Sequence, residues 1–152
     1  MMDRRGFRYP LAPLQKMTQW DANNLRQELA RLAAEERKRH AVVSQSEQAY
    51  QMATVAVREQ SMAGVLDAAR HSLWLRHLDQ LDGVLAQANK ALAEVSSRKQ
   101  EVVDLLAERH RYLKGLEAHR AELLQQFAKE QSAKEAVQLD ETWLVANRNK
   151  GN

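Results

Sequence analysis

A heptad pattern of apolar residues runs through the second half of this chain. The residues in the pattern advance alternately by three and by four: Leu78, Leu81, Leu85, Ala88, Leu92, Val95, Lys99, Val102, Leu106, Arg109, Leu113, Leu116, Arg120, Leu123 and Phe127. Only Lys99, Arg109 and Arg120 are charged. A repeat averaging about 3.5 residues is typical of a left-handed coiled coil. The pattern therefore predicts one long helix that packs against a partner helix.

A second, weaker heptad pattern precedes it. Its members are Ala22, Leu25, Leu29, Leu32, Glu36, Arg39, Val43, Ser46, Tyr50, Ala53 and Val57. Pro10 and Pro13 mark the start of this helix, because proline is tolerated in a first turn but not in a helix interior. The register turns Arg39, which belongs to the densest basic cluster, toward the partner helix.

Between the two patterns, Gly64 interrupts the repeat and Asp67 is suited to cap the helix that follows. A short connection favours antiparallel neighbours. The expected fold is all-α, a long two-helix antiparallel coiled-coil hairpin with the second helix longer than the first. Folding about the bend would place Leu32 near Val95 and Tyr50 near Trp74, although a slip of one heptad preserves much of the pairing.

We predict a single coiled-coil domain over residues 1–152. Its parts are a flexible N-terminal arm (1–10), helix 1 (11–60), a bend (61–66), helix 2 (67–138) and a C-terminal tail (139–152). The second helix should extend past the first, leaving Leu123, Phe127 and Val137 uncovered as a docking surface. Trp143 and Leu144 are costly to leave in water, so the tail is also expected to bind a partner.

Composition and motifs argue against catalysis. The chain has no cysteine, and no glycine-rich phosphate loop or nucleophile elbow occurs. Five histidines lack the spacing of a metal site. We expect a non-enzyme without catalytic residues, metal, cofactor or small-molecule substrate. Because 23 basic and 20 acidic residues are interspersed, nucleic acid is the weakest candidate partner. No run approaches 18 apolar residues, so we expect a soluble, intracellular protein.

Two features remain open to two interpretations. Lys99, Arg109 and Arg120 either fix the register of the coiled coil or mark where the helix meets another protein. Tyr50 and Trp74, which flank the bend, either pack on each other or form a binding hot spot.

The opening Phe7-Arg8-Tyr9-Pro10-Leu11-Ala12-Pro13-Leu14, the bend near residue 60 and the ending Leu139-Asp140-Glu141 with Trp143, Leu144 and Arg148 resemble the FliJ/YscO family. Members are small cytoplasmic coiled-coil proteins of flagellar and injectisome type III protein export. The resemblance implies a stalk that inserts into the ring of a hexameric export ATPase, reaches the membrane export gate protein and escorts export chaperones. Its expected place is the cytoplasmic face of the inner-membrane export apparatus.

From the resemblance and the two exposed ends we expect two contact sets. The ATPase-binding residues would be Leu11, Leu14, Met17, Leu123, Phe127, Leu139 and Trp143. The residues facing the export gate would be Val43, Tyr50, Trp74 and Leu81. The alternative is a homo-oligomeric coiled-coil scaffold without an ATPase partner, in which the two heptad patterns pair between chains.

Overall fold

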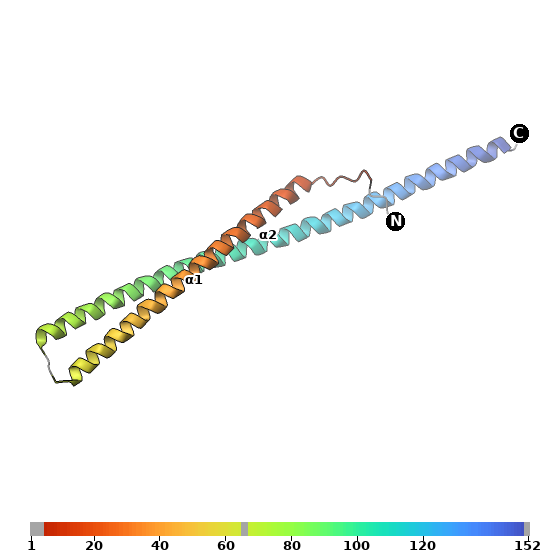
Figure 1. Cartoon of the computed structure of the whole chain (residues 1–152). Coiled ribbons are helices and arrows are strands. Elements are labelled where there is room, and N and C mark those ends of the chain that lie inside the picture. Colours follow the sequence, from red (N-terminus) through yellow and green to blue (C-terminus); the bar gives the residue numbers. More distant parts are fainter. Residues whose placement is uncertain (1–4, 65–66, 151–152) are drawn as a thin grey trace. The chain divides into compact units, whose positions relative to one another are not determined.

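The computed structural model describes residues 5–64 and 67–150 and shows a hairpin of two α-helices (Figure 1). Helix α1 spans Ala12–Met62, and helix α2 spans Ala68–Lys150. Their lengths are 51 and 83 residues. No strand occurs within the described residues. The predicted all-α hairpin with a longer second helix is confirmed.

Helix α1 starts beside the two prolines, as the sequence predicted. The amide of Ala12 donates to the carbonyl of Tyr9 at 3.1 Å, and the amide of Gln15 donates to the carbonyl of Leu11 at 2.9 Å. Pro13 has no N–H, but amides in a first helical turn have no intrahelical partner in any case. The prolines therefore fix the start of α1 without removing a helical hydrogen bond.

The bend is built from a glycine and an aspartate. Gly64 has a φ of 78°, the left-handed conformation that glycine adopts most easily after a helix end. At the start of α2, Asp67 accepts a hydrogen bond from the amide of Ala69 through its Oδ1 at 3.1 Å, which confirms the predicted cap. Helix α1 continues to Met62, inside the predicted bend, and positions 65 and 66 lie outside the described residues.

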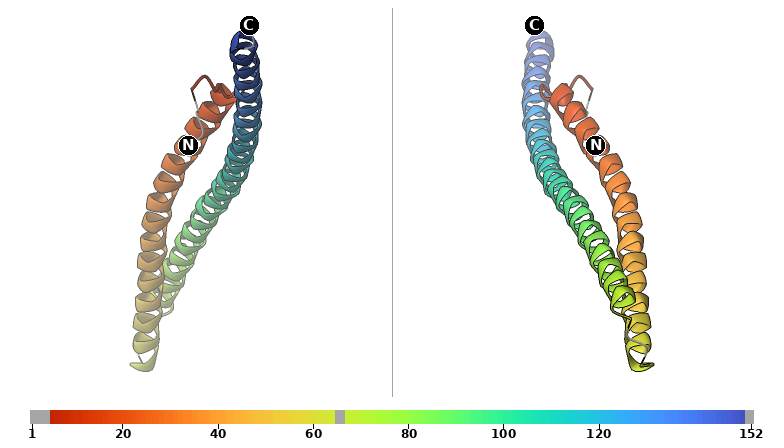
Figure 2. Two further views of the ribbon diagram at one scale, coloured as in Figure 1. Left: turned by 90° about the vertical axis from the view of Figure 1, so that its right-hand side faces the viewer. Right: turned by 90° about the vertical axis from the view of Figure 1, so that its left-hand side faces the viewer.

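Packing divides the chain into two units, Met1–Ala22 with Ala107–Asn152, and Asn23–Leu106. Within Asn23–Leu106, α1 and α2 run antiparallel and side by side (Figure 2). The core of this unit is a narrow seam in which Leu32, Ala53 and Ala88 are buried. Every heptad position predicted here is buried or half-buried except Arg39.

The inward orientation predicted for Arg39 is wrong. Its guanidinium binds Glu35, one turn earlier on the same helix, at 2.9 Å, and its side chain remains 44% exposed. The long side chain can follow the surface of its own helix to a carboxylate, which avoids burying the charge in an apolar seam.

A polar cluster in the seam shows which residues of α1 and α2 lie opposite each other in this unit. Glu36 accepts hydrogen bonds from Ser96 at 2.9 Å and from Lys99 at 2.6 Å. Pairing Leu32 with Val95, as predicted, would have placed Glu36 opposite Ala91. The observed contacts lie five and eight residues further along α2, a displacement of about one heptad, which the apolar pattern tolerates.

The end of α2 differs from the prediction. The helix continues through residues 139–150, which were expected to be a tail after a helix ending at about 138. The loss of the heptad pattern after residue 138 means that the helix no longer packs on a partner helix. It does not end the helix, because no glycine or proline occurs between Leu116 and Lys150. Arg148 and Lys150 in the last turn also suit the negative end of the helix dipole. The last two residues of the predicted tail are not described.

The N-terminal segment also differs from the prediction of a flexible arm. In the first unit, Tyr9 is only 8% exposed. Its hydroxyl donates to the carbonyl of Leu116 at 3.1 Å and lies 2.9 Å from Nδ1 of His119. Phe7 packs on Phe127 with ring centroids 5.6 Å apart. Aromatic rings with a buried hydroxyl partner therefore hold residues 7–9 against α2. Residues 1–4 of the predicted arm lie outside the described chain.

Candidate docking surfaces

The residues predicted at the ATPase end all belong to the unit Met1–Ala22 with Ala107–Asn152, where they fall into two groups. Leu14, Leu123 and Phe127 are half-buried, whereas Leu11, Met17, Leu139 and Trp143 are exposed. The first group contributes to packing within the chain. The second group is free to contact a partner.

The expectation that Phe127 has no intramolecular cover is wrong. Its ring lies against Phe7 of the N-terminal segment. The sequence contained an indication of this contact. The aromatic residues of the opening segment lie outside both heptad patterns, so they need another apolar surface on which to pack. Sequence reasoning used that segment only as a family feature and missed Phe7, Tyr9 and His119 as a packed cluster.

The last part of α2 is the most exposed apolar segment of this unit. Every described residue from 132 to 150 is exposed, and Val137, Leu139, Trp143, Leu144 and Val145 have exposed fractions between 57% and 70%. An uncovered group of large apolar side chains on one helix is typical of a protein contact surface. This observation agrees with the docking role expected for this end.

These apolar side chains occupy a wide arc of the helix. With about 100° between successive residues, the residues Ala133, Ala136, Val137, Leu139, Trp143, Leu144 and Ala146 cover about half the circumference. Asp140 interrupts this arc, and Val145 lies on the other side of the helix. Val137 and Leu139 lie near the two edges of this apolar arc, about 160° apart. A coiled-coil seam is narrower, because it uses only two positions per heptad. One partner helix would leave part of the arc in water.

The residues predicted to face the export gate lie in the unit Asn23–Leu106. Val43, Tyr50, Trp74 and Leu81 are all half-buried and contribute to the seam between α1 and α2. The ring of Trp74 makes an edge-on contact with His77 at 6.0 Å, whereas no ring contact joins it to Tyr50 among the described residues. Of the two interpretations of Tyr50 and Trp74, ring packing of one on the other is therefore not seen.

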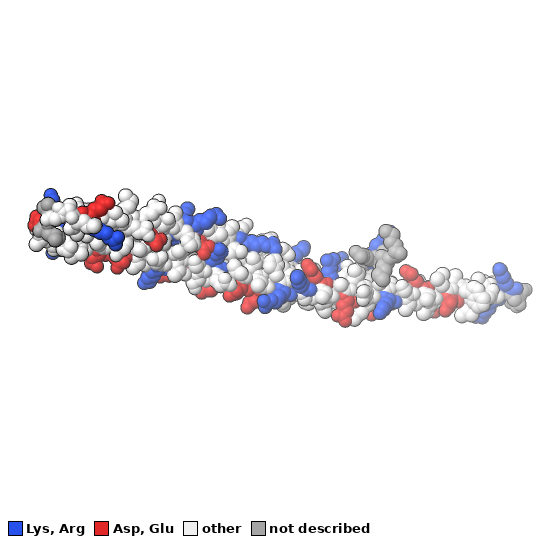
Figure 3. Space-filling view, turned by 90° about the horizontal axis from the view of Figure 1, so that it is seen from below, with Lys and Arg blue, Asp and Glu red and all other residues white. Residues whose placement is uncertain are grey.

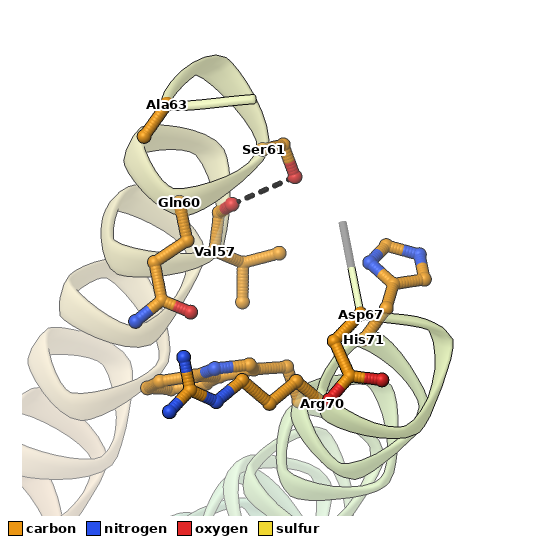
Figure 4. Close-up of a pocket in the computed structure, with 8 residues that line it drawn as sticks. Val57, Gln60, Ser61, Ala63, Asp67, Arg70 and His71 are labelled. Atoms are coloured by element: carbon orange, nitrogen blue, oxygen red, sulfur yellow. Dashed lines mark hydrogen bonds between the residues drawn. The ribbon is translucent and has the colours of Figure 1, made fainter. Parts of the chain in front are cut away.

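Other apolar residues are exposed near the bend. Met52, Val55, Met62, Leu73, Leu75 and Val84 have more than half of their surface in contact with solvent. A cavity of about 210 Å³ also opens between the two helix ends, lined by Val57, Gln60 and Ser61 of α1, by the capping Asp67 and by Arg70 and His71 of α2 (Figure 4). Figure 4 shows Arg70 extending across this cavity toward α1. The bend therefore offers an accessible surface, and Trp74, one of the residues predicted to face the gate, is among those that line its cavity.

The three charged residues of the α2 seam have different surroundings. Lys99 binds Glu36 at 2.6 Å and, with Ser96, holds the pKa of that carboxyl below its ordinary value of 4.5. Arg109 and Arg120 are exposed. Lys99 therefore fits the interpretation of a register-fixing polar residue, whereas Arg120 lies against the N-terminal segment at the edge of a cavity.

Charges of both signs are mixed along the surface. Figure 3 shows lysine and arginine side chains interspersed with aspartate and glutamate over the face drawn. Within the described residues, no group of three or more histidine, aspartate or glutamate side chains is arranged to hold a metal ion. The described helices contain no stretch that is both long and apolar enough to cross a membrane.

Comparisons with family models, with curated proteins and with solved structures find no match to this chain.

Proposed function

We propose that this chain is a non-enzymatic central stalk and assembly or escort factor of a type III protein export system. The end of α2 inserts into the hexameric ring of an export ATPase, and the bend faces the membrane export gate. Residues 133–150 and the exposed Leu11 and Met17 make the ring contacts. Export chaperones bind to the same protein.

The observation that carries this proposal is the apolar arc of α2 over residues 133–146. The arc is exposed in the isolated chain and too wide for a single partner helix. Burying apolar surface stabilises a complex by roughly 25 cal/mol per Å². A channel that surrounds the helix end would cover both edges of the arc at once, as a ring of subunits does.

The asymmetry of the hairpin end supports a regulatory effect on the ring. A single helix whose sides differ in apolar character makes different contacts with successive subunits of a sixfold ring. A ligand that binds two states of a protein unequally shifts the balance between them. The stalk would thereby favour ring assembly and particular nucleotide states.

The test is to mix the purified chain with the export ATPase from the same source and measure the hydrolysis rate, with ring formation followed by electron microscopy. We expect faster hydrolysis and rings with a filled centre. Replacing Leu139, Trp143 and Leu144 by serine should abolish both effects. A matched control replaces Gln138, Glu141 and Asn149, which lie on the polar side of the same segment, and should behave like the original chain.

Absence of stimulation by a well-folded chain would refute the stalk proposal. Sedimentation at a multiple of the chain mass of 17.4 kDa, lost in the same triple-serine variant, would instead establish the homo-oligomeric scaffold.

The contact with the gate is tested separately at the bend. The proposal assigns this contact to the exposed Met62, Leu73 and Leu75, next to the half-buried seam residues Tyr50, Trp74 and Leu81. Replacing Leu73 and Leu75 by serine should weaken binding to the gate protein in a pull-down assay and leave stimulation of the ATPase intact. Loss of both activities together would contradict this division between the two ends.

A further inference from the structure

A second surface in the unit Met1–Ala22 with Ala107–Asn152 is unlike the apolar arc. A cavity of about 380 Å³ opens where the N-terminal segment and the first turns of α1 lie against α2. Phe7 and Tyr9 supply aromatic walls, Gln15 and Gln19 supply amides, and Lys16 and Arg120 supply cations. Among the described residues, no acidic side chain lines the cavity.

The two cations of this cavity have no bound carboxylate among the described residues. Among the described residues, neither Lys16 nor Arg120 takes part in an ion pair or a hydrogen bond. Elsewhere Arg31, Arg39 and Lys99 each bind a glutamate. Two cations without counter-charges beside low-dielectric aromatic walls create a positive potential that attracts an anion.

Arg120 is also unexplained by the hairpin itself. It stands at a heptad position where the pattern calls for an apolar residue, yet its side chain is exposed at the cavity. The interpretation that a charged seam residue marks a contact with another protein therefore applies to Arg120.

We propose that this cavity binds an acidic peptide segment of a partner protein, with one apolar side chain beside its carboxylates. The guanidinium of Arg120 matches a carboxylate with two parallel hydrogen bonds, and the ammonium of Lys16 binds a second carboxylate. The apolar side chain packs on Phe7 and Tyr9. The amides of Gln15 and Gln19 donate to and accept from the peptide backbone.

Tyr9 is the positioning residue of this site. Its hydroxyl is held by the carbonyl of Leu116 and by His119, so the aromatic walls stay against α2. Loss of these hydrogen bonds would increase the fraction of molecules in which the N-terminal segment is released and the cavity lacks one side. The site therefore exists only while the N-terminal segment is packed.

The experiment titrates the full chain, labelled with ¹⁵N, with the peptide N-acetyl-Phe-Glu-Glu-amide and follows the amide resonances. We expect saturable shifts at residues 15–19 and around Arg120. Lys16→Gln or Arg120→Gln should each weaken binding by about tenfold, the effect of removing one charge-assisted hydrogen bond. Tyr9→Phe should also weaken binding of the acidic peptide, because the walls become mobile.

Two controls separate this site from general charge attraction. The neutral peptide N-acetyl-Phe-Gln-Gln-amide should cause no saturable shift. Lys129→Gln removes an exposed cation of α2 that does not line the cavity, and should leave the affinity unchanged.

Each remaining outcome overturns the proposal. No shift with the acidic peptide, or equal shifts with both peptides, excludes an acidic-peptide site. Shifts at the same residues by inorganic phosphate at equal or lower concentration would show a general anion site instead. None of these results depends on the export ATPase, so they neither support nor refute the stalk proposal.

Discussion

At the scale of single residues, Tyr9 joins the N-terminal segment to α2 through both its ring and its hydroxyl. The hydroxyl satisfies the carbonyl of Leu116 and contacts the ring nitrogen of His119. Removing a buried hydrogen bond costs about 1 kcal/mol, or roughly a fivefold change in an equilibrium between packed and released forms.

Tyr9→Phe should therefore expose the peptide bond after Arg8 and raise the initial rate of trypsin cleavage there roughly fivefold. Tyr112→Phe is the matched control, because Tyr112 is exposed and forms no hydrogen bond among the described residues. Equal cleavage rates in Tyr9→Phe and the original chain would show that the aromatic packing alone holds the segment.

Glu36 gives the hairpin a pH dependence. The hydrogen bonds from Lys99 and Ser96 lower the pKa of this carboxyl in the folded chain below 4.5, so the unfolded chain binds the proton more readily. The stabilisation is therefore complete above pH 4.5 and is lost as the pH falls through the folded value.

Glu36→Gln should be less stable than the original chain to urea at pH 7, and the difference should shrink below pH 4.5. Glu94→Gln, at an exposed carboxyl without an ion pair in the described chain, should unfold like the original at both pH values. A Glu36→Gln deficit that persists unchanged in acid would rule out the ionic origin of the effect.

At the scale of the helices, two glycines occupy opposite backbone conformations. Gly64 ends α1 with a φ of 78°, whereas Gly115 lies inside α2, and a Cβ at either position would meet no atom within 4 Å. Steric room for a Cβ therefore does not distinguish the two positions. Only the backbone conformation decides the effect of adding a methyl group.

Gly64→Ala should destabilise the hairpin by about 1 kcal/mol, because an L-residue is strained in the left-handed region. Gly115→Ala should stabilise it by about 1 kcal/mol, because alanine loses less backbone entropy in a helix. Urea denaturation followed by circular dichroism measures both. Equal effects of the two substitutions would contradict the assignment of Gly64 as the helix-terminating residue.

The helices were largely predictable because their signals are local or periodic. The prolines marked the start of α1, Gly64 and Asp67 marked the helix ends at the bend, and the heptad pattern identified the inward face from Leu25 to Leu106. The end of α2 was not predictable from the heptad pattern. The pattern indicates where a helix packs on a partner helix, and a helix can continue beyond that region. The packing of Phe7 and Tyr9 depends on contacts with residues more than 100 positions away, which periodicity does not record.

At the scale of the whole molecule, the hairpin buries only a narrow seam. Leu32 is the largest side chain that is essentially buried, at 2% exposure. Leu32→Ala should therefore remove a large share of the total stability, about 2–4 kcal/mol, measured as a shift of the urea midpoint. Leu73→Ala, at an exposed position, is the control and should change stability by less than about 0.5 kcal/mol. A small effect of Leu32→Ala would mean that partners, not the seam, stabilise the helices.

Candidate docking residues were less predictable than the fold. The exposed Leu139 and Trp143 are accessible as expected, whereas Val43, Tyr50, Trp74 and Leu81 are half-buried in the seam. The heptad pattern identifies residues that face a helix, and these four are part of it or next to it. Exposed apolar residues such as Leu73 and Leu75 lie off the pattern, so periodicity gave no reason to choose them.

The central claim is that a ring of subunits encloses the end of α2. Because the chain contains no cysteine, a photoreactive benzophenone can be attached to a single cysteine introduced as Val137→Cys or Leu139→Cys, at the two edges of the apolar arc. Gln48→Cys, at an exposed position in the other unit, serves as control. We expect both arc positions, but not the control, to cross-link to the export ATPase. Cross-linking from only one edge, to a second copy of this chain, or from neither position would contradict enclosure by the ring.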